Sequence, residues 1–164
     1  MLVLGIDPGT ATTGWGLIES LESGFVVKKW GLIETSKENL DEVRLQSIHR
    51  QMLVLLDEHK PDVFAIEKVF FATNAKTAIN VGQAIGVMLL SAASKKILVK
   101  QYAPGTIKKM VAGSGRADKK IVQQAVRKIL GNQVKSEAHK KTHFDNAADA
   151  LAIALCHVMM ENGK

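Results

Sequence analysis

Two carboxylates stand at the ends of apolar runs, where a fold could bring them together. Asp7 follows residues 2–6, and Glu67 follows residues 63–66. If these runs are neighbouring strands of an open α/β sheet, the carboxylates meet at the sheet edge where such folds bind ligands. Close carboxylates repel each other unless a cation lies between them, and oxygen ligands suit Mg²⁺ or Mn²⁺. Alternatively, Asp-Pro-Gly is only a good turn, and Glu67 forms a salt bridge with Lys68 or another lysine.

A third group lies near the end of the chain, in the sequence Asp145-Asn146-Ala147-Ala148-Asp149. Residues three or four apart share a helix face, so Asp149 would lie beside both Asp145 and Asn146. The intervening alanines make a lean helix that can pack close to a sheet. The ordinary alternative is that these acidic residues only stabilise a helix N-terminus.

The hydrophobic pattern predicts the elements that would position these groups. An antiparallel meander of three strands is followed by a helix and a buried parallel strand, and this order indicates an α/β fold. The predicted strands cover residues 2–6, 13–18, 25–33, 63–66 and 97–99, and the predicted helices cover 39–59, 75–94, 118–130 and 144–160, with another beginning at Pro104.

The basic residues are concentrated in one stretch of the chain. The net charge is +6, yet residues 95–141 alone carry +11, with thirteen Lys or Arg against Asp118 and Glu137, and the remaining residues carry −5. Clustered lysines favour a polyanionic partner, because phosphate binding releases counterions. A lysine-rich solvated surface would explain the same charge.

Length and composition exclude several classes of protein. With 164 residues, 46% hydrophobic and 23% charged, we expect a single globular domain over residues 1–164. One cysteine excludes a disulfide scaffold and a cysteine-cluster zinc site, and no phosphate-binding P-loop motif occurs. We expect a cytoplasmic protein, because the N-terminal sequence lacks signal-peptide features and the apolar stretch 81–94 is too short to span a membrane.

Three separated motifs resemble the RuvC family of Holliday-junction resolvases. They are residues 5–10 (GIDPGT), 66–71 (IEKVFF) and 147–154 (AADALAIA), and residues 81–84 and 113–119 fit the same pattern between them. The resemblance covers nearly the whole chain in the family's order. It implies an α/β, RNase-H-like fold: a mixed five-stranded sheet with helices on both faces. It also implies an endodeoxyribonuclease that resolves four-way DNA junctions by paired, symmetric, Mg²⁺-dependent nicks, leaving 5′-phosphate and 3′-hydroxyl ends.

The resemblance also implies roles for individual residues and partners. A homodimer would act on the junction with a branch-migration motor complex as partner, and our candidate interface is the helix over 75–94, where Gly82 and Gly86 lie four residues apart. Two Mg²⁺ ions would bind in each site, and Mn²⁺ could substitute. The catalytic and metal-binding set would be Asp7, Glu67, Asn146 and Asp149, and the DNA-contacting residues would be Phe70, Lys108, Arg116 and Lys119.

Position 146 departs from the family's pattern, which usually has a carboxylate, and in some members a histidine, three residues before the final aspartate. Asn146 offers one carbonyl oxygen and no charge, so it should hold a divalent cation less well. Asp145 could substitute, because residues 145 and 149 also share a helix face. Asn146 could also be an engineered change that blocks cleavage, or a natural variant of lower activity.

Other functions stay open at this point. An RNase-H-like nuclease acting on structured RNA would use the same acidic residues. A junction-binding module disabled by Asn146 would bind and never cut. Phe70 could be a core residue, and the lysines could be solvated surface residues. Residues 5–10 also resemble the phosphate loop of sugar kinases and actin-like ATPases, but those proteins need two lobes and a longer chain.

Overall fold

A five-stranded sheet in the order β3-β2-β1-β4-β5 forms the centre of the computed structural model. The structure describes residues 1–68, 75–131 and 141–163, without the side chains of residues 75–76 and 141–146. The strands are β1 (Leu2–Asp7), β2 (Thr12–Leu21), β3 (Gly24–Glu34), β4 (Val63–Glu67) and β5 (Leu98–Tyr102), and the helices are α1 (Asp41–His59), α2 (Ala75–Ser94), α3 (Pro104–Ala112), α4 (Lys119–Leu130) and α5 (Lys141–Asn162).

The strand register places the first two predicted carboxylates side by side. β1, β2 and β3 form the predicted antiparallel meander, and β1 also pairs in parallel with β4. Ile6 lies opposite Ile66, so Asp7 and Glu67 are the next residues of two adjacent parallel strands. The expectation that both carboxylates reach the same sheet edge is therefore confirmed.

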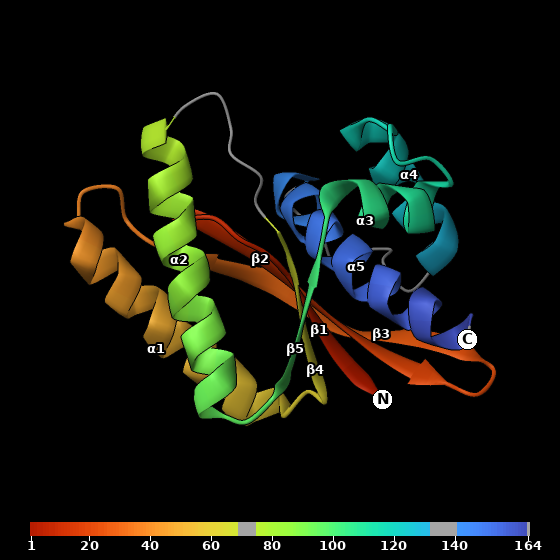
Figure 1. Cartoon of the computed structure of the whole chain (residues 1–164), viewed down its shortest axis with the longest axis horizontal. Helices are drawn as coiled ribbons and strands as arrows, with labels where there is room; N and C mark the ends of the chain where they lie inside the picture. The colour runs from red at the N-terminus through yellow and green to blue at the C-terminus, as the bar shows by residue number, and fades with distance from the viewer. Residues whose placement is uncertain (69–74, 132–140, 164) are drawn as a thin grey trace.

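Helices cover both faces of the sheet (Figure 1). α1 and α2 lie on one face, and α5 lies on the other with α3 and α4 beside it. Successive residues of a strand point to opposite faces. Leu4 accordingly packs in the core cluster that includes Phe64 and Met88, whereas Val3 packs in the cluster that includes Leu151 of α5. This α/β architecture matches the predicted fold.

The lean helix α5 packs directly against the backbone of β1. A Cβ atom added to Gly5 would lie 2.1 Å from the carbonyl oxygen of Ala150 and 2.7 Å from the backbone nitrogen of Ala154. Only glycine on the strand and small residues on the helix permit this approach. The contact fixes α5 against the strand that carries Asp7, and Asp149 lies next to Ala150 on that helix.

Several predicted boundaries shift by a few residues. β5 begins at Leu98 and continues to Tyr102, beyond the predicted residues 97–99. α4 begins at Lys119 rather than at 118, because the Asp118 carboxylate caps the helix by accepting the Ile121 N–H at 2.9 Å. α5 begins at Lys141, three residues before the predicted start.

The uncharged part of α2 is longer than the stretch that the sequence analysis considered. It runs from Thr77 to Ser94, and by length and composition alone it could cross a membrane. Ala84 and Met88 are nevertheless fully buried in the core, whereas Leu90 is 63% exposed. α2 therefore buries one face in this chain and leaves a second apolar face open.

Candidate active site

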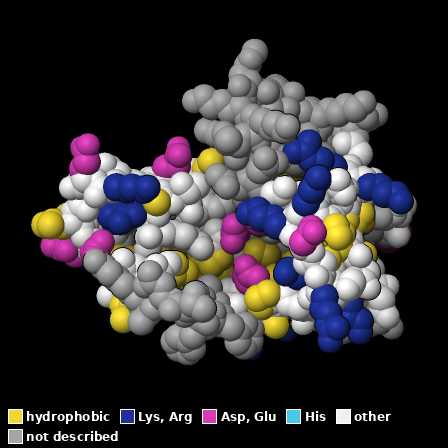
Figure 2. Space-filling model, turned by 90° about the horizontal axis from the view of Figure 1, so that it is seen from above, with side chains coloured by type: hydrophobic (Ala, Val, Ile, Leu, Met, Phe, Trp, Pro, Cys, Tyr) yellow, Lys and Arg dark blue, Asp and Glu magenta, His cyan; other side chains and the backbone are white. Residues whose placement is uncertain are grey.

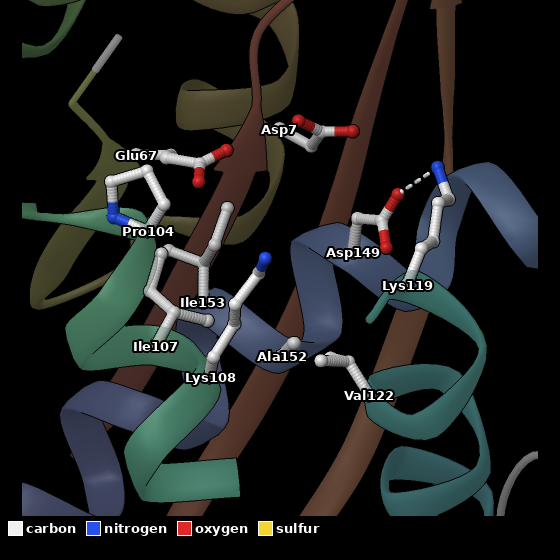
Figure 3. A pocket seen from close by; sticks show the side chains of 10 residues that line it. All are labelled: Asp7, Glu67, Pro104, Ile107, Lys108, Lys119, Val122, Asp149, Ala152 and Ile153. Atoms are coloured by element: carbon white, nitrogen blue, oxygen red, sulfur yellow. Dashed lines mark ion pairs between the residues drawn. The ribbon is translucent and has the colours of Figure 1, made fainter. Parts of the chain in front are cut away.

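A single pocket gathers acidic side chains from three elements (Figure 3). Asp7 ends β1, Glu67 ends β4, and Asp149 comes from α5. The remaining lining residues are two lysines and a set of mainly apolar side chains, Pro104, Ile107, Lys108, Lys119, Val122, Ala152 and Ile153. The structure thus brings together the three predicted carboxylates whose side chains it describes.

Burial raises the pKa of Asp7 from its ordinary 3.8 to about 7. The negative charges of Asp149 and Glu67 add to the rise, and the positive charge of Lys119 opposes it. Ionised Asp7 is therefore unfavourable unless a cation lies nearby. This is the electrostatic behaviour expected of a carboxylate that serves as a metal ligand.

Glu67 behaves in the same way. Its pKa is raised, first by burial and then by the charge of Asp149, whereas Lys108 and Lys119 lower it. Lys108 comes from α3 and lines the same pocket. The alternative of a simple salt bridge to Lys68 is not supported, because the lysines that act on Glu67 come from α3 and α4, while Lys68 is exposed.

Lys119 forms an ion pair with Asp149 across the pocket. The distance between Lys119 Nζ and Asp149 Oδ2 is 2.6 Å (Figure 3). Lys119 is the first residue of α4, and the Asp118 cap fixes the start of that helix. The sequence analysis identified Lys119 and Asp149 as site residues but did not predict their ion pair. That pair depends on how α4 packs beside α5.

The chemistry of the donor set fits a hard divalent cation. Asp7, Glu67 and Asp149 supply carboxylate oxygens, the ligands that Mg²⁺ and Mn²⁺ prefer, and their mutual repulsion would be relieved by such an ion. Within the described ranges, however, no three acidic, histidine or cysteine side chains lie close enough to hold one ion together. Asp149 Oδ2 is paired with Lys119 at 2.6 Å in this arrangement.

The other predicted site residues have different outcomes. Asp145 and Asn146 lie on α5 within four residues of Asp149, but their side chains are outside the described part. Phe70 lies outside the described residues altogether. Arg116 is exposed in the loop between α3 and α4 and does not line the pocket.

On the face seen from above, basic side chains lie on the side of the acidic ones where α3 and α4 are (Figure 2). The exposed lysines and arginines of this region are Lys109, Arg116, Lys119, Lys120, Arg127 and Lys128. A basic surface beside a carboxylate pocket suits a phosphate backbone that must approach bound metal ions.

The sheet topology, the covering helices and the acidic pocket define a metal-dependent nuclease of the RNase-H-like class. A family model described as crossover junction endodeoxyribonuclease RuvC matches residues 3–157. The chain belongs to this family of endodeoxyribonucleases. The resemblance seen in the sequence, and the class of fold and enzyme that it implied, are thereby confirmed.

Individual relatives agree with this assignment. The chain is 46% identical to a crossover junction endodeoxyribonuclease RuvC from Syntrophomonas wolfei, over 96% of this chain and 88% of the relative. It is 42% identical to one from Caldicellulosiruptor saccharolyticus, over 97% of this chain and 93% of the relative. Among solved structures, T. thermophilus RuvC in complex with a Holliday junction substrate has a TM-score of 0.84 at 30% identity, over 99% of this chain and 96% of that one. The fowlpox virus resolvase, at 18% identity and a TM-score of 0.65 over 100% of both chains, shares the fold.

Proposed function

We propose that this protein resolves four-way DNA junctions by paired, symmetric nicks that leave 5′-phosphate and 3′-hydroxyl ends. The observation that carries the proposal is the pocket that joins Asp7, Glu67 and Asp149 beside the basic helices α3 and α4. Family membership supports the substrate, because the T. thermophilus relative was solved with a Holliday junction. The whole chain, residues 1–164, would act as one nuclease domain in the cytoplasm.

We assign the catalytic and metal-binding roles to Asp7, Glu67 and Asp149, together with position 146 or Asp145. The cofactor would be two Mg²⁺ ions per site, replaceable by Mn²⁺. When bound, such ions lower the pKa of a water for in-line attack and stabilise the leaving 3′-oxygen. The β1 and β4 strands would hold Asp7 and Glu67 at fixed positions.

We assign Phe70, Lys108, Arg116 and Lys119 to DNA contact. Lys108 and Lys119 support this role most directly, because both line the acidic pocket and would face a phosphate bound there. Lys119 would hold Asp149 in the absence of DNA and turn toward the phosphate in its presence. Arg116 lies further out and would contact the backbone away from the reacting phosphate.

We propose that the enzyme is a homodimer that uses the open face of α2. Leu90 and Ile79 of this face are 63% and 62% exposed. A Cβ atom added to Gly82 or Gly86 would meet no atom within 4 Å, so a second helix could approach the backbone there. A twofold dimer would present two pockets to a substrate with near-twofold symmetry. We also propose a branch-migration motor complex as a partner, and only the family likeness supports this proposal.

The test is a nicking assay on a synthetic four-way junction, with a linear duplex and a structured RNA as matched substrates. We expect cuts at paired positions in the junction with Mg²⁺, no cuts with EDTA, and products that DNA ligase reseals. Junction binding should exceed duplex binding and weaken steeply with salt. Preferred cleavage of the RNA would favour the RNA-nuclease alternative. Tight junction binding without any cutting would favour the disabled binding module.

A further inference from the structure

Hydrogen bonds from Thr13 and Thr35 hold the turn that follows Asp7. Residues 8–11 connect β1 to β2, and the Thr13 hydroxyl donates to the carbonyl oxygen of Gly9 at 2.7 Å. Thr35, directly after β3, donates its backbone N–H to the Ala11 oxygen at 3.0 Å and its hydroxyl to the Thr10 oxygen at 2.6 Å. Three carbonyls of this short turn therefore have fixed partners.

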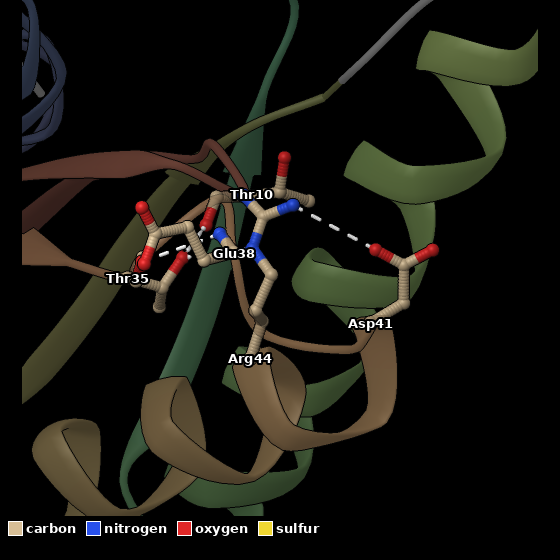
Figure 4. Close-up of polar contacts among 6 residues, drawn as sticks. Thr10, Thr35, Glu38, Asp41 and Arg44 are labelled. Atoms are coloured by element: carbon tan, nitrogen blue, oxygen red, sulfur yellow. Dashed lines mark hydrogen bonds and ion pairs between the residues drawn. The ribbon is translucent and has the colours of Figure 1, made fainter.

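Arg44 of α1 completes this arrangement (Figure 4). Its Nε donates to the Thr35 hydroxyl oxygen at 3.1 Å. The single hydrogen of that hydroxyl goes to Thr10, so the oxygen can only accept from Arg44. On its other side, Arg44 Nη1 lies 3.6 Å from Asp41 Oδ1. A chain of contacts thus leads from Asp41 through Arg44 and Thr35 to the turn after Asp7.

The burial of Arg44 shows that this contact is more than a surface ion pair. The Arg44 side chain is only 12% exposed, whereas that of Asp41 is 65% exposed. An ion pair with Asp41 alone could form in solvent without the cost of burying the guanidinium. In its buried position, Arg44 also makes the charge-assisted hydrogen bond to Thr35. This bond polarises the Thr35 hydroxyl, which donates to the Thr10 oxygen.

We propose that Arg44 is a positioning residue for catalysis: acting through Thr35, it fixes the turn of residues 8–11 and thereby the carboxylate of Asp7. The inference rests on the proposed function, because Asp7 is the residue that it positions. Arg44 does not line the acidic pocket. Its effect is through geometry, and a misplacement of about 1 Å at a reacting group can reduce a rate by about 10²-fold.

Two substitutions test the two links separately. Arg44→Met removes the donor and keeps an unbranched apolar stem, and Thr35→Val removes the hydroxyl while it keeps the backbone N–H. Thr35→Ser restores the hydroxyl and serves as the conservative rescue. Arg50→Met is the matched control, because Arg50 lies on the same helix and is exposed.

The first readout is amide hydrogen exchange without metal, followed over residues 7–13 and over the core of α5. We expect Arg44→Met and Thr35→Val to exchange at least about fivefold faster over residues 7–13, with α5 unchanged, since local opening differs from global unfolding. Mn²⁺ binding measured by calorimetry should weaken in both variants. With Mg²⁺, junction nicking should fall about tenfold, while junction binding stays within twofold of the starting protein. Thr35→Ser and Arg50→Met should behave like the unmodified protein.

A purely structural role predicts a different pattern. The variants would then lose thermal stability, but the folded protein would keep its hydrogen exchange in the turn, its Mn²⁺ affinity and its nicking rate. This result would overturn the proposal. If Arg44→Met does not fold, Thr35→Val decides alone. Absence of nicking by the unmodified protein would contradict the proposed function, whereas faster exchange in the variants would still support the fixing of the turn.

Discussion

The carboxylate of Asp7 ends a buried strand within reach of the charges of Asp149 and Glu67, and its pKa rises from 3.8 to about 7. Between about pH 4 and about pH 7, the folded site therefore keeps a proton that the unfolded chain has released. Because the folded state binds more protons in this window, the free energy of unfolding falls as the pH rises. Above about pH 7 both states are ionised and this dependence ends.

Removal of the ionisable group should therefore stabilise the metal-free protein near neutral pH. We expect Asp7→Asn to raise the melting temperature in EDTA by about 4–8 °C at about pH 8, equivalent to ~2 kcal/mol after allowance for partial exposure. At about pH 4 the difference should nearly vanish. Thermal unfolding across this pH range is the measurement, and an equal shift at both pH values would contradict the electrostatic explanation.

Lys119 lies at 2.6 Å from Asp149, yet its side chain is 64% exposed. An exposed ion pair contributes about 0–1 kcal/mol to stability. We therefore expect Lys119→Ala to lower junction nicking at least about tenfold while the melting temperature changes little. Lys120→Ala, at the next position on α4, which is also exposed, is the control. Equal nicking rates in the two variants would show that Lys119 is an ordinary solvated lysine with no role in nicking.

Position 146 lies three residues before Asp149 on α5. If both hold a metal, the asparagine removes one charge from an electrostatic site, and the loss of one preorganised interaction costs about 10²–10³ in rate. Asn146→Asp should then raise Mg²⁺-dependent nicking at least about tenfold. If Asp145 fills the role instead, Asp145→Asn should abolish nicking and Asn146→Asp should change little. Both hypotheses fail if neither substitution alters nicking while Asp7→Asn abolishes it.

At the scale of elements, the open apolar face of α2 carries the dimer proposal. Leu90 is 63% exposed on this face. A charge buried in a dimer interface without a partner is strongly unfavourable. We expect Leu90→Asp to produce monomers in sedimentation experiments, with the monomer's fold retained.

Val54→Asp on α1 is the matched control for that experiment, since Val54 is 60% exposed on a different helix. It should leave the oligomeric state unchanged. A Leu90→Asp protein that sediments like the unmodified one would exclude this face of α2 as the interface.

The elements themselves were largely predictable, because their patterns are local. Apolar runs that end at Asp7 and Glu67 were sufficient to predict two strands, and the structure shows that these strands are adjacent and parallel, which the sequence analysis stated only as a condition. Helix starts were less predictable, since Asp118 acts as a cap rather than as a helical residue.

The contacts between elements were not predictable in the same way. The pairing of Lys119 with Asp149 depends on the approach of α4 to α5, and no local pattern encodes that approach. The contact between Arg44 and Thr35 joins a helix to the end of a strand. Family resemblance supplied the proposed roles of individual residues, which hydrophobic periodicity alone cannot supply.

At the scale of the whole molecule, charge and fold act together. Residues 95–141 carry +11 against −5 elsewhere, and the described part of this segment contains α3 and α4, which flank the acidic pocket. The basic surface would attract the phosphate backbone, and the carboxylates would hold the ions that cut it. In the proposed function, most of the binding surface lies outside the acidic pocket, so we expect substitutions there to weaken binding more than cutting.

The most direct test compares the unmodified protein with Asp7→Asn on one labelled four-way junction, with binding measured in EDTA and nicking measured with Mg²⁺. We predict equal junction affinity for the two proteins, paired nicks by the unmodified protein, and a loss of nicking of at least about 10²-fold in the variant. Nicking by Asp7→Asn at the rate of the unmodified protein would contradict the assignment of this pocket as the active site.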